Sequence, residues 1–413
     1  DGQQKGLGDP IDYNFTNYVN WLGFFGQAQY TTGDISAYGM AGLTTVSYTH
    51  WNHFKRASDY DYSYVSEKDG SSADWVEGPG DDMGGNAGEL YIEADPITTS
   101  QFKGGLMYDL GDKLSFFNAI PVFGKLYDNT NIWVNFGLVD KAPIFDQVIQ
   151  DWDAKMSTDP INENFTAFEL GFNSSSNDGT MAAKFNLYST QWKDRIQTKT
   201  VGDQGDSTDD IIVYLTGIDQ AHSGIEFELA WQAHPMLRID MGVGLGNWTY
   251  TDDASGSYRD GDTDVAFAYA LKDLPVGDMP QRNLVMGFTA TPVEGATIQA
   301  VYKYYDRHFA DWNISSREYD PTSGDFTGSD EVWQAPSYGI LDIHAYYDLP
   351  FELGPAKPQL FLHIFNALDV VYIQDATHNS SYNSWDKIGT AADDAEVFFG
   401  APTSFNLGLS VNF

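Results

Sequence analysis

The last ten residues of the chain alternate strictly between two kinds of side chain. Small or amide residues stand at every second position from Ser404 to Asn412. Between them stand apolar residues, namely Phe405, Leu407, Leu409, Val411 and Phe413. Successive side chains of an extended strand point to opposite sides of the sheet, so this segment predicts a strand with one wholly apolar face.

The same alternation recurs at residues 225–232, 298–305 and 341–348. In the first of these, Ile225, Phe227 and Leu229 alternate with Glu226 and Glu228. A series of such strands is typical of a transmembrane β-barrel with a lipid face and a wet lumen. A soluble β-sandwich with its apolar faces turned inward shows the same pattern, so alternation alone leaves both architectures open.

The lengths of the predicted connections favour the barrel, because outer-membrane barrels alternate short periplasmic turns with long extracellular loops. Short turns are predicted at residues 31–34, 174–179, 233–236, 292–295 and 350–358. Long polar connections are predicted at about 53–99, 140–163, 197–210, 251–264, 308–335 and 374–396. This division predicts about fourteen strands, with two or three of them between residues 101 and 139.

Aromatic residues make up 15% of the chain and gather toward the predicted strand ends. Such positions predict aromatic girdles at the two membrane interfaces. The residues assigned to these girdles are Trp21, Tyr30, Tyr48, Trp51, Trp133, Tyr188, Trp192, Trp231, Trp248, Tyr250, Tyr302 and Tyr305.

Composition excludes several classes of protein. No run of residues is apolar for long enough to form a spanning helix. The formal net charge of −37 would repel nucleic acid. Eleven acidic residues stand between Asp59 and Asp95 against the single base Lys68, as expected of a solvated loop. The chain has no cysteine, which excludes disulfides, thiol catalysis and thiolate metal sites.

No catalytic or cofactor motif is recognisable, and we predict that the chain is not an enzyme and holds no cofactor or metal. Glu226 and Glu228 share a strand face, which would suit a glycosidase pair, but a hydrated lumen explains them better. His344 and His363 fall on neighbouring strands, where pairing or metal binding competes with an ordinary role in the wall. The acidic run at 202–210 lacks the EF-hand pattern.

Several segments resemble TonB-dependent receptors, in the order that this family uses. They are "NIWVNFGLVDKAPIFDQV" from Asn131, "NENFTAFELGFN", "AAKFNLYSTQWKDRI", "TGIDQAHSGIEFELAW" and "FLHIFNALDVVYIQDA". In the last, Asn366, Leu368, Asp369 and Tyr372 match a motif usually written Asn-X-Phe-Asp-X-X-Tyr. The closing segment "FFGAPTSFNLGLSVNF" matches at Gly400, Pro402 and Phe413.

The resemblance implies an outer-membrane receptor that binds a scarce nutrient with its extracellular loops and imports it with energy passed through TonB. The family has 22-stranded barrels with a plugged lumen. No plug is recognisable here, so residues 1–413 are predicted to be a single β-barrel domain that forms the C-terminal part of such a barrel. The implied partners are outer-membrane lipid, an upstream plug with the remaining strands, the TonB complex and a candidate surface lipoprotein.

Under this resemblance the closing strand carries the assembly signal, formed by Phe405, Leu407, Leu409, Val411 and Phe413. The ligand-binding residues are left open. Two readings from other classes also stay open: a passive porin or structural barrel that closes by itself, and a soluble β-rich binding protein.

Overall fold

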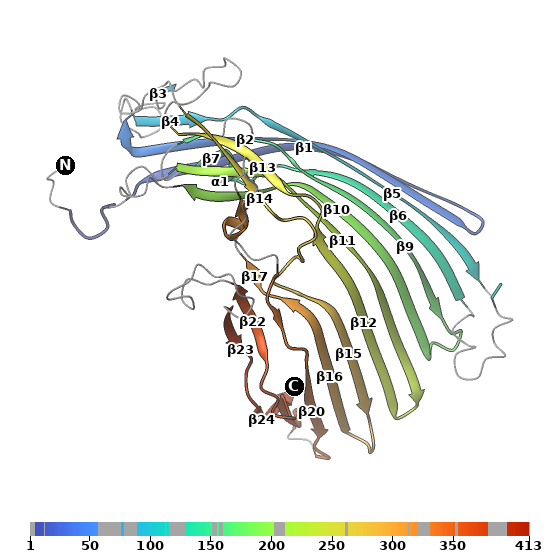
Figure 1. Cartoon of the computed structure of the whole chain (residues 1–413). Helices are drawn as coiled ribbons and strands as arrows, with labels where there is room; N and C mark the ends of the chain where they lie inside the picture. Colours follow the sequence, from blue (N-terminus) through green and yellow to red (C-terminus); the bar gives the residue numbers. More distant parts are fainter. Residues whose placement is uncertain are drawn as a thin grey trace.

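One antiparallel sheet dominates the computed structural model (Figure 1). The structure describes residues 5–11, 13–56, 76–77, 89–111, 113–114, 129–150, 155–156, 160–201, 211–260, 263–312, 314–319, 331–351, 354–378 and 395–412. Thirteen long strands follow one another in the sheet in chain order. They are β1 (Phe15–Thr32), β2 (Ile35–Arg56), β5 (Ile97–Gly111), β6 (Asn129–Lys141), β9 (Glu163–Ser175), β10 (Met181–Val201), β11 (Ile211–His234), β12 (Leu237–Tyr250), β15 (Pro280–Ala290), β16 (Ala296–Phe309), β20 (Tyr338–Asp348), β21 (Lys357–Phe365) and β24 (Ser404–Asn412).

Shorter elements occupy the connections. The helical ones are α1 (Phe145–Val148) and the 3₁₀ turn η6 (Ile314–Arg317). The short strands are β3 (Val76–Glu77), β4 (Glu89–Glu93), β7 (Ile149–Gln150), β8 (Lys155–Met156), β13 (Ala254–Asp260), β14 (Thr263–Tyr269), β17 (Asp311–Trp312), β18 (Glu318–Tyr319), β19 (Gln334–Ala335), β22 (Ile373–His378) and β23 (Ala395–Phe399). Neither described helix is long and apolar enough to cross a membrane.

The connections confirm the predicted asymmetry. The five short turns, at 33–34, 176–180, 235–236, 291–295 and 349–356, all join strands at one end of the sheet. The six connections that carry the short elements or long loops lie at the other, which we call the long-loop end. One connection departs from the rule, because residues 112–128 join β5 to β6 at the short-turn end and form a longer segment than any of the turns there. Among its described residues, the segment between 101 and 139 holds two strands, β5 and β6.

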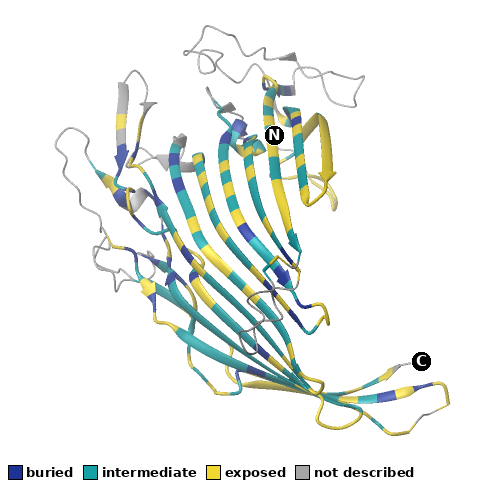
Figure 2. Cartoon of the chain, turned by 90° about the vertical axis from the view of Figure 1, so that its right-hand side faces the viewer, coloured by how far each residue is buried: buried dark blue, intermediate teal, exposed yellow. Residues whose placement is uncertain are grey.

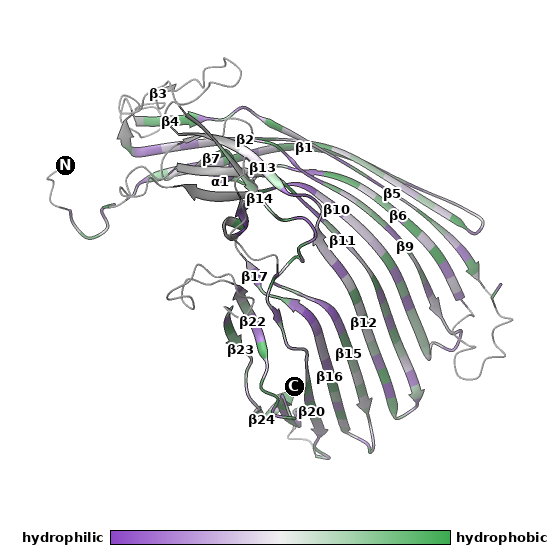
Figure 3. Cartoon of the chain, in the orientation of Figure 1, coloured by the Kyte–Doolittle hydropathy of each residue, from purple (hydrophilic) through white to green (hydrophobic). Residues whose placement is uncertain are grey.

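The predicted separation into an apolar and a polar face is confirmed by the strand register. Residues that pair directly across the sheet share a face, and one row of such partners crosses six strands from β5 to β12 without a polar side chain. This row consists of Leu106, Val134, Leu170, Leu187, Ile225 and Leu245. Figure 2 shows the alternation of burial along the strands, and Figure 3 the matching alternation of hydropathy.

The opposite face carries polar side chains that bind one another across strands. Lys184 Nζ lies 3.5 Å from Glu228 Oε2, and Asn186 Nδ2 donates to Glu226 Oε2 at 3.2 Å. Both members of the Lys184–Glu228 pair are 67% exposed. Glu226 and Glu228 thus line the polar face, in agreement with the hydrated-lumen interpretation.

The predicted aromatic girdles are mostly wrong. Eight of the twelve assigned residues lie on the polar face, because the period of two places their side chains opposite the apolar row. These eight are Trp21, Tyr48, Trp133, Tyr188, Trp192, Trp248, Tyr250 and Tyr305. The other four, Tyr30, Trp51, Trp231 and Tyr302, share the apolar face.

Several aromatic rings of the polar face lie directly over a glycine of the neighbouring strand. The paired residues are Tyr38 with Gly105, Trp133 with Gly171, Tyr188 with Gly224 and Phe361 with Gly408. A Cβ at any of these glycines would overlap the ring. The missing side chain is therefore what allows each ring to rest against the wall.

This arrangement predicts that Gly171→Ala destabilises the sheet, whereas Gly39→Ala does not. A Cβ at Gly171 would overlap both Phe185 O and the Trp133 ring, whereas a Cβ at Gly39 has nothing within 4 Å. We expect overpacking at Gly171 to cost about 1–3 kcal/mol. The measurement is the unfolding midpoint of the detergent-extracted protein, read from its heat-modifiable mobility on gels. Equal midpoints for the two variants would contradict the prediction.

Candidate functional site

The residues of the predicted closing strand lie together on β24 at one edge of the sheet. Phe405, Leu407, Leu409 and Val411 pair on the apolar face with Ile364, Leu362, Leu360 and Pro358 of β21. Phe405 is 73% exposed and Leu407 66% exposed, so this face has little protein cover. Phe413, the fifth residue of the predicted signal, lies outside the described residues.

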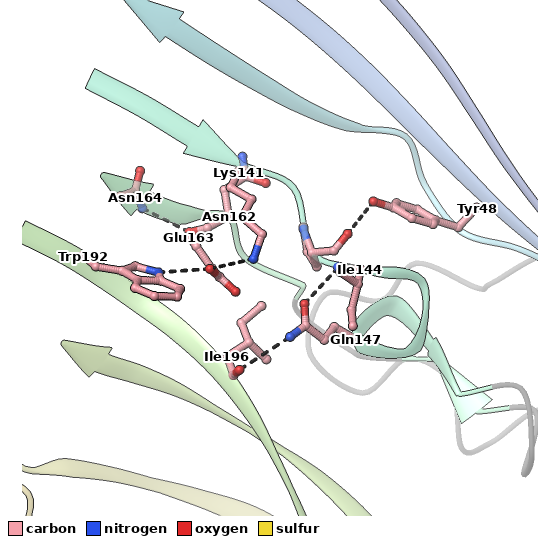
Figure 4. A network of polar contacts seen from close by, with 10 residues as sticks. Tyr48, Lys141, Ile144, Gln147, Asn162, Glu163, Asn164, Trp192 and Ile196 are labelled. Carbon is pink, nitrogen blue, oxygen red and sulfur yellow. Dashed lines mark hydrogen bonds and ion pairs between the residues drawn. The ribbon is translucent and has the colours of Figure 1, made fainter. Parts of the chain in front are cut away.

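The long-loop end is the candidate binding region, because the long connections converge there and are held by defined contacts. The first anchor is a buried carboxylate at the start of β9 (Figure 4). Glu163 is 2% exposed. Its Oε2 atom accepts hydrogen bonds from Lys141 Nζ at 3.0 Å and from Trp192 Nε1 at 3.0 Å. Lys141 ends β6, so this group ties three neighbouring strands together where the connection 142–162 begins and ends.

The Lys-Ala-Pro-Ile-Phe-Asp segment, residues 141–146, leads from the end of β6 into α1. Tyr48 OH donates to Pro143 O at 2.6 Å, and Ile144 N donates to Gln147 Oε1 at 2.8 Å (Figure 4). Behind the turn, Val148 and Ile149 are buried in one apolar cluster with Tyr48 and residues of β4. The base of this connection is therefore packed as well as hydrogen-bonded.

A second anchor holds the connection between β21 and β24. Asn366 is 3% exposed, and its Nδ2 donates to Val370 O at 2.9 Å and to Ala401 O at 3.2 Å. Its Oδ1 accepts from Val370 N at 3.0 Å. The backbone of Asn366 has φ of 47°, a left-handed conformation that asparagine adopts more readily than most residues.

Asp342 of β20 fastens this turn to the wall. Its Oδ1 accepts from Asn366 N at 2.9 Å, and its Oδ2 lies 2.9 Å from Lys303 Nζ. Tyr372 stacks on Tyr338 with ring centroids 4.5 Å apart, and its carbonyl accepts from Gly400 N at 2.9 Å. The motif residues Asn366, Tyr372 and Gly400 thus meet in one place.

A third structure at this end is an apolar core formed by the connections themselves. It includes Tyr250, Leu271, Trp312, Ile314 and Val332, which come from the top of β12 and from two different connections. Its other buried members are Ile218, Ala254, Tyr269 and Leu274. The ring of Trp312 lies 5.1 Å from that of Tyr250, and the Arg317 guanidinium lies 5.3 Å from the Trp312 ring. This core holds the surrounding loops in fixed positions relative to one another.

Three carboxylates, those of Asp278, Asp311 and Asp375, lie near one another beside this core. Burial raises the pKa of Asp311, and the nearby negative charges of Asp278 and Asp375 raise it further. The hydrogen bond from Trp312 N and the charge of Arg195 act in the opposite direction. Carboxylates gathered in this way favour a positively charged group over an anion.

The remaining candidate cation and metal sites provide little evidence of binding. The acidic run at 202–210 lies outside the described residues. Within the part of the chain that the structure describes, no three His, Cys, Asp or Glu side chains are placed to hold a metal together. His344 and His363 do face each other, as their strand positions predicted.

Sequence reasoning missed the two carboxylates on which the anchors depend. Glu163 and Asp342 stand in strands and carry no motif of their own. For Glu163 the available signal was its position opposite Lys141 in the next strand. For Asp342 the available signal was Lys303. Which residue Lys303 meets depends on the register between β16 and β20, which the sequence does not fix.

We predict that Asn366→Ala loosens the connection between β21 and β24 while the wall stays folded. The substitution removes the partner of the Val370 N–H and of the Val370 and Ala401 carbonyls, at a cost of about 0.5–1.5 kcal/mol for each hydrogen bond. Limited proteolysis of the detergent-extracted protein should show faster cleavage between residues 366 and 403. Asn129→Ala, which removes an exposed contact to Asn177, is the control and should leave the cleavage rate unchanged.

Comparison with known proteins gives a family for this fold. Residues 2–367 match the family model described as "TonB dependent receptor-like, beta-barrel". A comparison with curated protein sequences gave no match.

Solved structures of receptors share the fold. The siderophore receptor PiuA from Acinetobacter baumannii superposes with a TM-score of 0.57 at 13% identity, over 97% of this chain and 44% of that one. The unliganded ferric citrate transporter FecA gives 0.56 at 12% identity, over 100% and 48%. The ferric-catecholate import receptor Fiu from E. coli K12 gives 0.55 at 13%, over 96% and 45%. The chain thus spans slightly less than half the length of these proteins, and at such identities the likeness shows the fold alone.

Proposed function

The chain belongs to the TonB-dependent receptor-like β-barrel family, and from that premise we propose that it forms the C-terminal part of an outer-membrane receptor that imports a nutrient. The observation that carries the proposal is the exposed apolar face of the sheet, on which the row from Leu106 to Leu245 crosses six strands without a polar side chain. Exposed apolar surface on this scale needs a partner, and lipid is the partner that fits a curved sheet whose other face is polar.

The edges of the sheet support a larger barrel. Among the described residues β1 pairs only with β2, and β24 only with β21. Because thirteen strands follow one another antiparallel, β1 and β24 run in the same direction. An antiparallel closure therefore needs an odd number of further strands between them, and nine would complete the 22-stranded form. We propose that these strands and a plug come from upstream in the same gene product or from a separate chain.

The closing strand is proposed to guide assembly into the outer membrane. Phe405, Leu407, Leu409 and Val411 give β24 its apolar face, and Phe413 would extend the same pattern. The strand stands at an edge, where it is available for recognition before the barrel closes.

Ligand capture is assigned to the long-loop end and import to the polar face. The loop core and the two anchors supply rigid positions from which a binding surface can be built. Structural neighbours are named as receptors or transporters for a ferric catecholate, a siderophore and ferric citrate. The net charge of −37 and the acidic surface beside Asp311 disfavour a free anionic iron chelate, so we propose a bulky nutrient that is neutral or carries positive charge.

Import against a gradient needs an energy source, which we propose to be the TonB complex acting on the plug. A surface lipoprotein is a further proposed partner at the long-loop end. The alternative in a different class is a passive porin, which would close from its own strands, conduct ions and need no TonB.

The proposed orientation predicts that Leu407→Arg impairs membrane assembly and Asn406→Arg does not. Leu407 lies on the apolar face near the middle of β24, where a charge in lipid costs about 2–4 kcal/mol. Asn406 is its neighbour on the polar face. The readout is the amount of folded protein in isolated outer membranes. Equal amounts for both variants would rule out a lipid-facing role for this row.

Uptake by whole cells tests the import proposal. Cells that carry the intact gene, cells that lack it and cells that lack TonB should be compared for uptake of radioactive ferric citrate, cobalamin and a labelled oligosaccharide. We expect uptake of cobalamin or of the oligosaccharide to fall in both mutants alike, and uptake of ferric citrate, an anionic chelate, not to depend on this gene. The intact mass of the native protein should exceed 45.9 kDa, since the plug and further strands would add to it.

The porin alternative predicts a different set of results. Uptake would then be independent of TonB, the native mass would match the present chain, and the purified protein would conduct ions in a planar bilayer. That combination would overturn the receptor proposal.

A further inference from the structure

Two histidines face each other on the polar side of the wall. His344 of β20 and His363 of β21 pair directly in the strand register. Their Nδ1 atoms are 2.8 Å apart, and the rings meet at 64° with centroids separated by 5.0 Å. Both side chains are partly exposed, so solutes that enter the space in front of the polar face can reach them.

This separation has two chemical explanations. Two neutral imidazoles can share one proton between their Nδ1 atoms, or both lone pairs can bind one metal ion. Bonds from metal to histidine nitrogen are about 2.0–2.1 Å long. Two such bonds at a right angle place the nitrogens about 2.9 Å apart, whereas tetrahedral bonds place them roughly 3.3–3.4 Å apart. The observed Nδ1–Nδ1 separation of 2.8 Å therefore fits an ion that binds neighbouring ligands at right angles, as in tetragonal coordination.

The neighbouring strands place more oxygen and nitrogen donors in the same row. Gln299 of β16 is the direct partner of His344, and Asn406 of β24 is the direct partner of His363. Direct partners on one face have Cβ atoms about 4.5–5.5 Å apart, so both amides lie within reach of an ion held between the histidines. The Asp342 carboxylate, two residues before His344, is already bound to Lys303 and to Asn366 N.

Aromatic rings limit how the two imidazoles can turn. The ring of Tyr346 lies 5.5 Å from that of His363 at an interplanar angle of 74°, and the ring of Phe361 lies 5.2 Å from that of His363. Phe365 lies 5.7 Å from His344. Because these rings fill the flanks, little side-chain entropy would be lost when both nitrogens bind one ion.

We propose that His344 and His363 form a chelating site for a divalent transition metal of tetragonal preference, with Cu²⁺ bound most tightly and Ni²⁺ next. The order follows the general affinity of nitrogen ligands for first-row ions. Since no third His, Cys, Asp or Glu among the described residues is placed to complete the set, water or the flanking amides occupy the remaining positions. The site lies on the wall that the imported nutrient would pass, and it does not depend on what that nutrient is.

The experiment titrates Cu²⁺ into the whole protein, extracted from outer membranes in detergent and carrying no histidine tag. Electron paramagnetic resonance should show one bound Cu²⁺ per protein with coupling to two nitrogens. His344→Ala and His363→Ala should each remove one nitrogen from the copper signal. Each should weaken Cu²⁺ binding roughly 100-fold, because the ion is then held by one histidine instead of two. His222→Ala is the matched control, since His222 lies on the same face, is paired with Trp248 across the strands and has Gln220, not another histidine, as its hydrogen-bond partner.

The wild-type protein alone keeps the proposal falsifiable if a variant fails to fold. Absence of a two-nitrogen copper signal in the wild type, whose folding is checked by heat-modifiable mobility, would overturn the proposal. The same conclusion would follow if folded His344→Ala and His222→Ala bound Cu²⁺ equally well. Either result would leave the pair as two imidazoles that share a proton.

Discussion

Backbone pairing between neighbouring antiparallel strands is the constraint from which the other features of this chain follow. Each long strand gives its hydrogen bonds to the strands beside it, and the register of that pairing fixes which residues share a face. A shift of β10 by one position relative to its neighbours would bring Leu187 to the polar side and Asn186 to the apolar side. The polar contacts, the anchors and the histidine pair all depend on this register being kept across thirteen strands.

Much of the wall was predictable because apolar and polar residues alternate along its strands with a period of two. Segments such as 225–232 and 404–412 have their apolar residues on the predicted face, and the five short turns fall where Gly, Pro and polar residues cluster. The prediction of aromatic girdles failed for a definite reason. It used the position of each ring along a strand and not its parity, so Trp133 and Tyr188 were assigned to interfaces although they lie on the polar face.

The long-loop end was less accessible to sequence reasoning. The contacts at this end join residues far apart in the chain, as Tyr48 with Pro143 and Asp342 with Lys303 show. Such pairs follow from the curvature and register of the sheet, which local patterns do not specify. The motif around Asn366 was recognisable, but the reason for it was not. The asparagine is needed because one side chain must accept from and donate to the backbone in a turn with positive φ.

The rings that lie over glycines have a consequence for the width of any passage along this wall. Tyr38, Trp133, Tyr188 and Phe361 lie flat because their partners have no side chain. At Gly105 and Gly408 the added methyl group would meet side-chain atoms only, so it would lift the Tyr38 or Phe361 ring away from the wall, although the residue that changed is itself small. How far each of these rings stands out from the wall is thus set by a side chain that its partner lacks, and a change of one glycine codon would alter the polar surface without altering any aromatic residue on it.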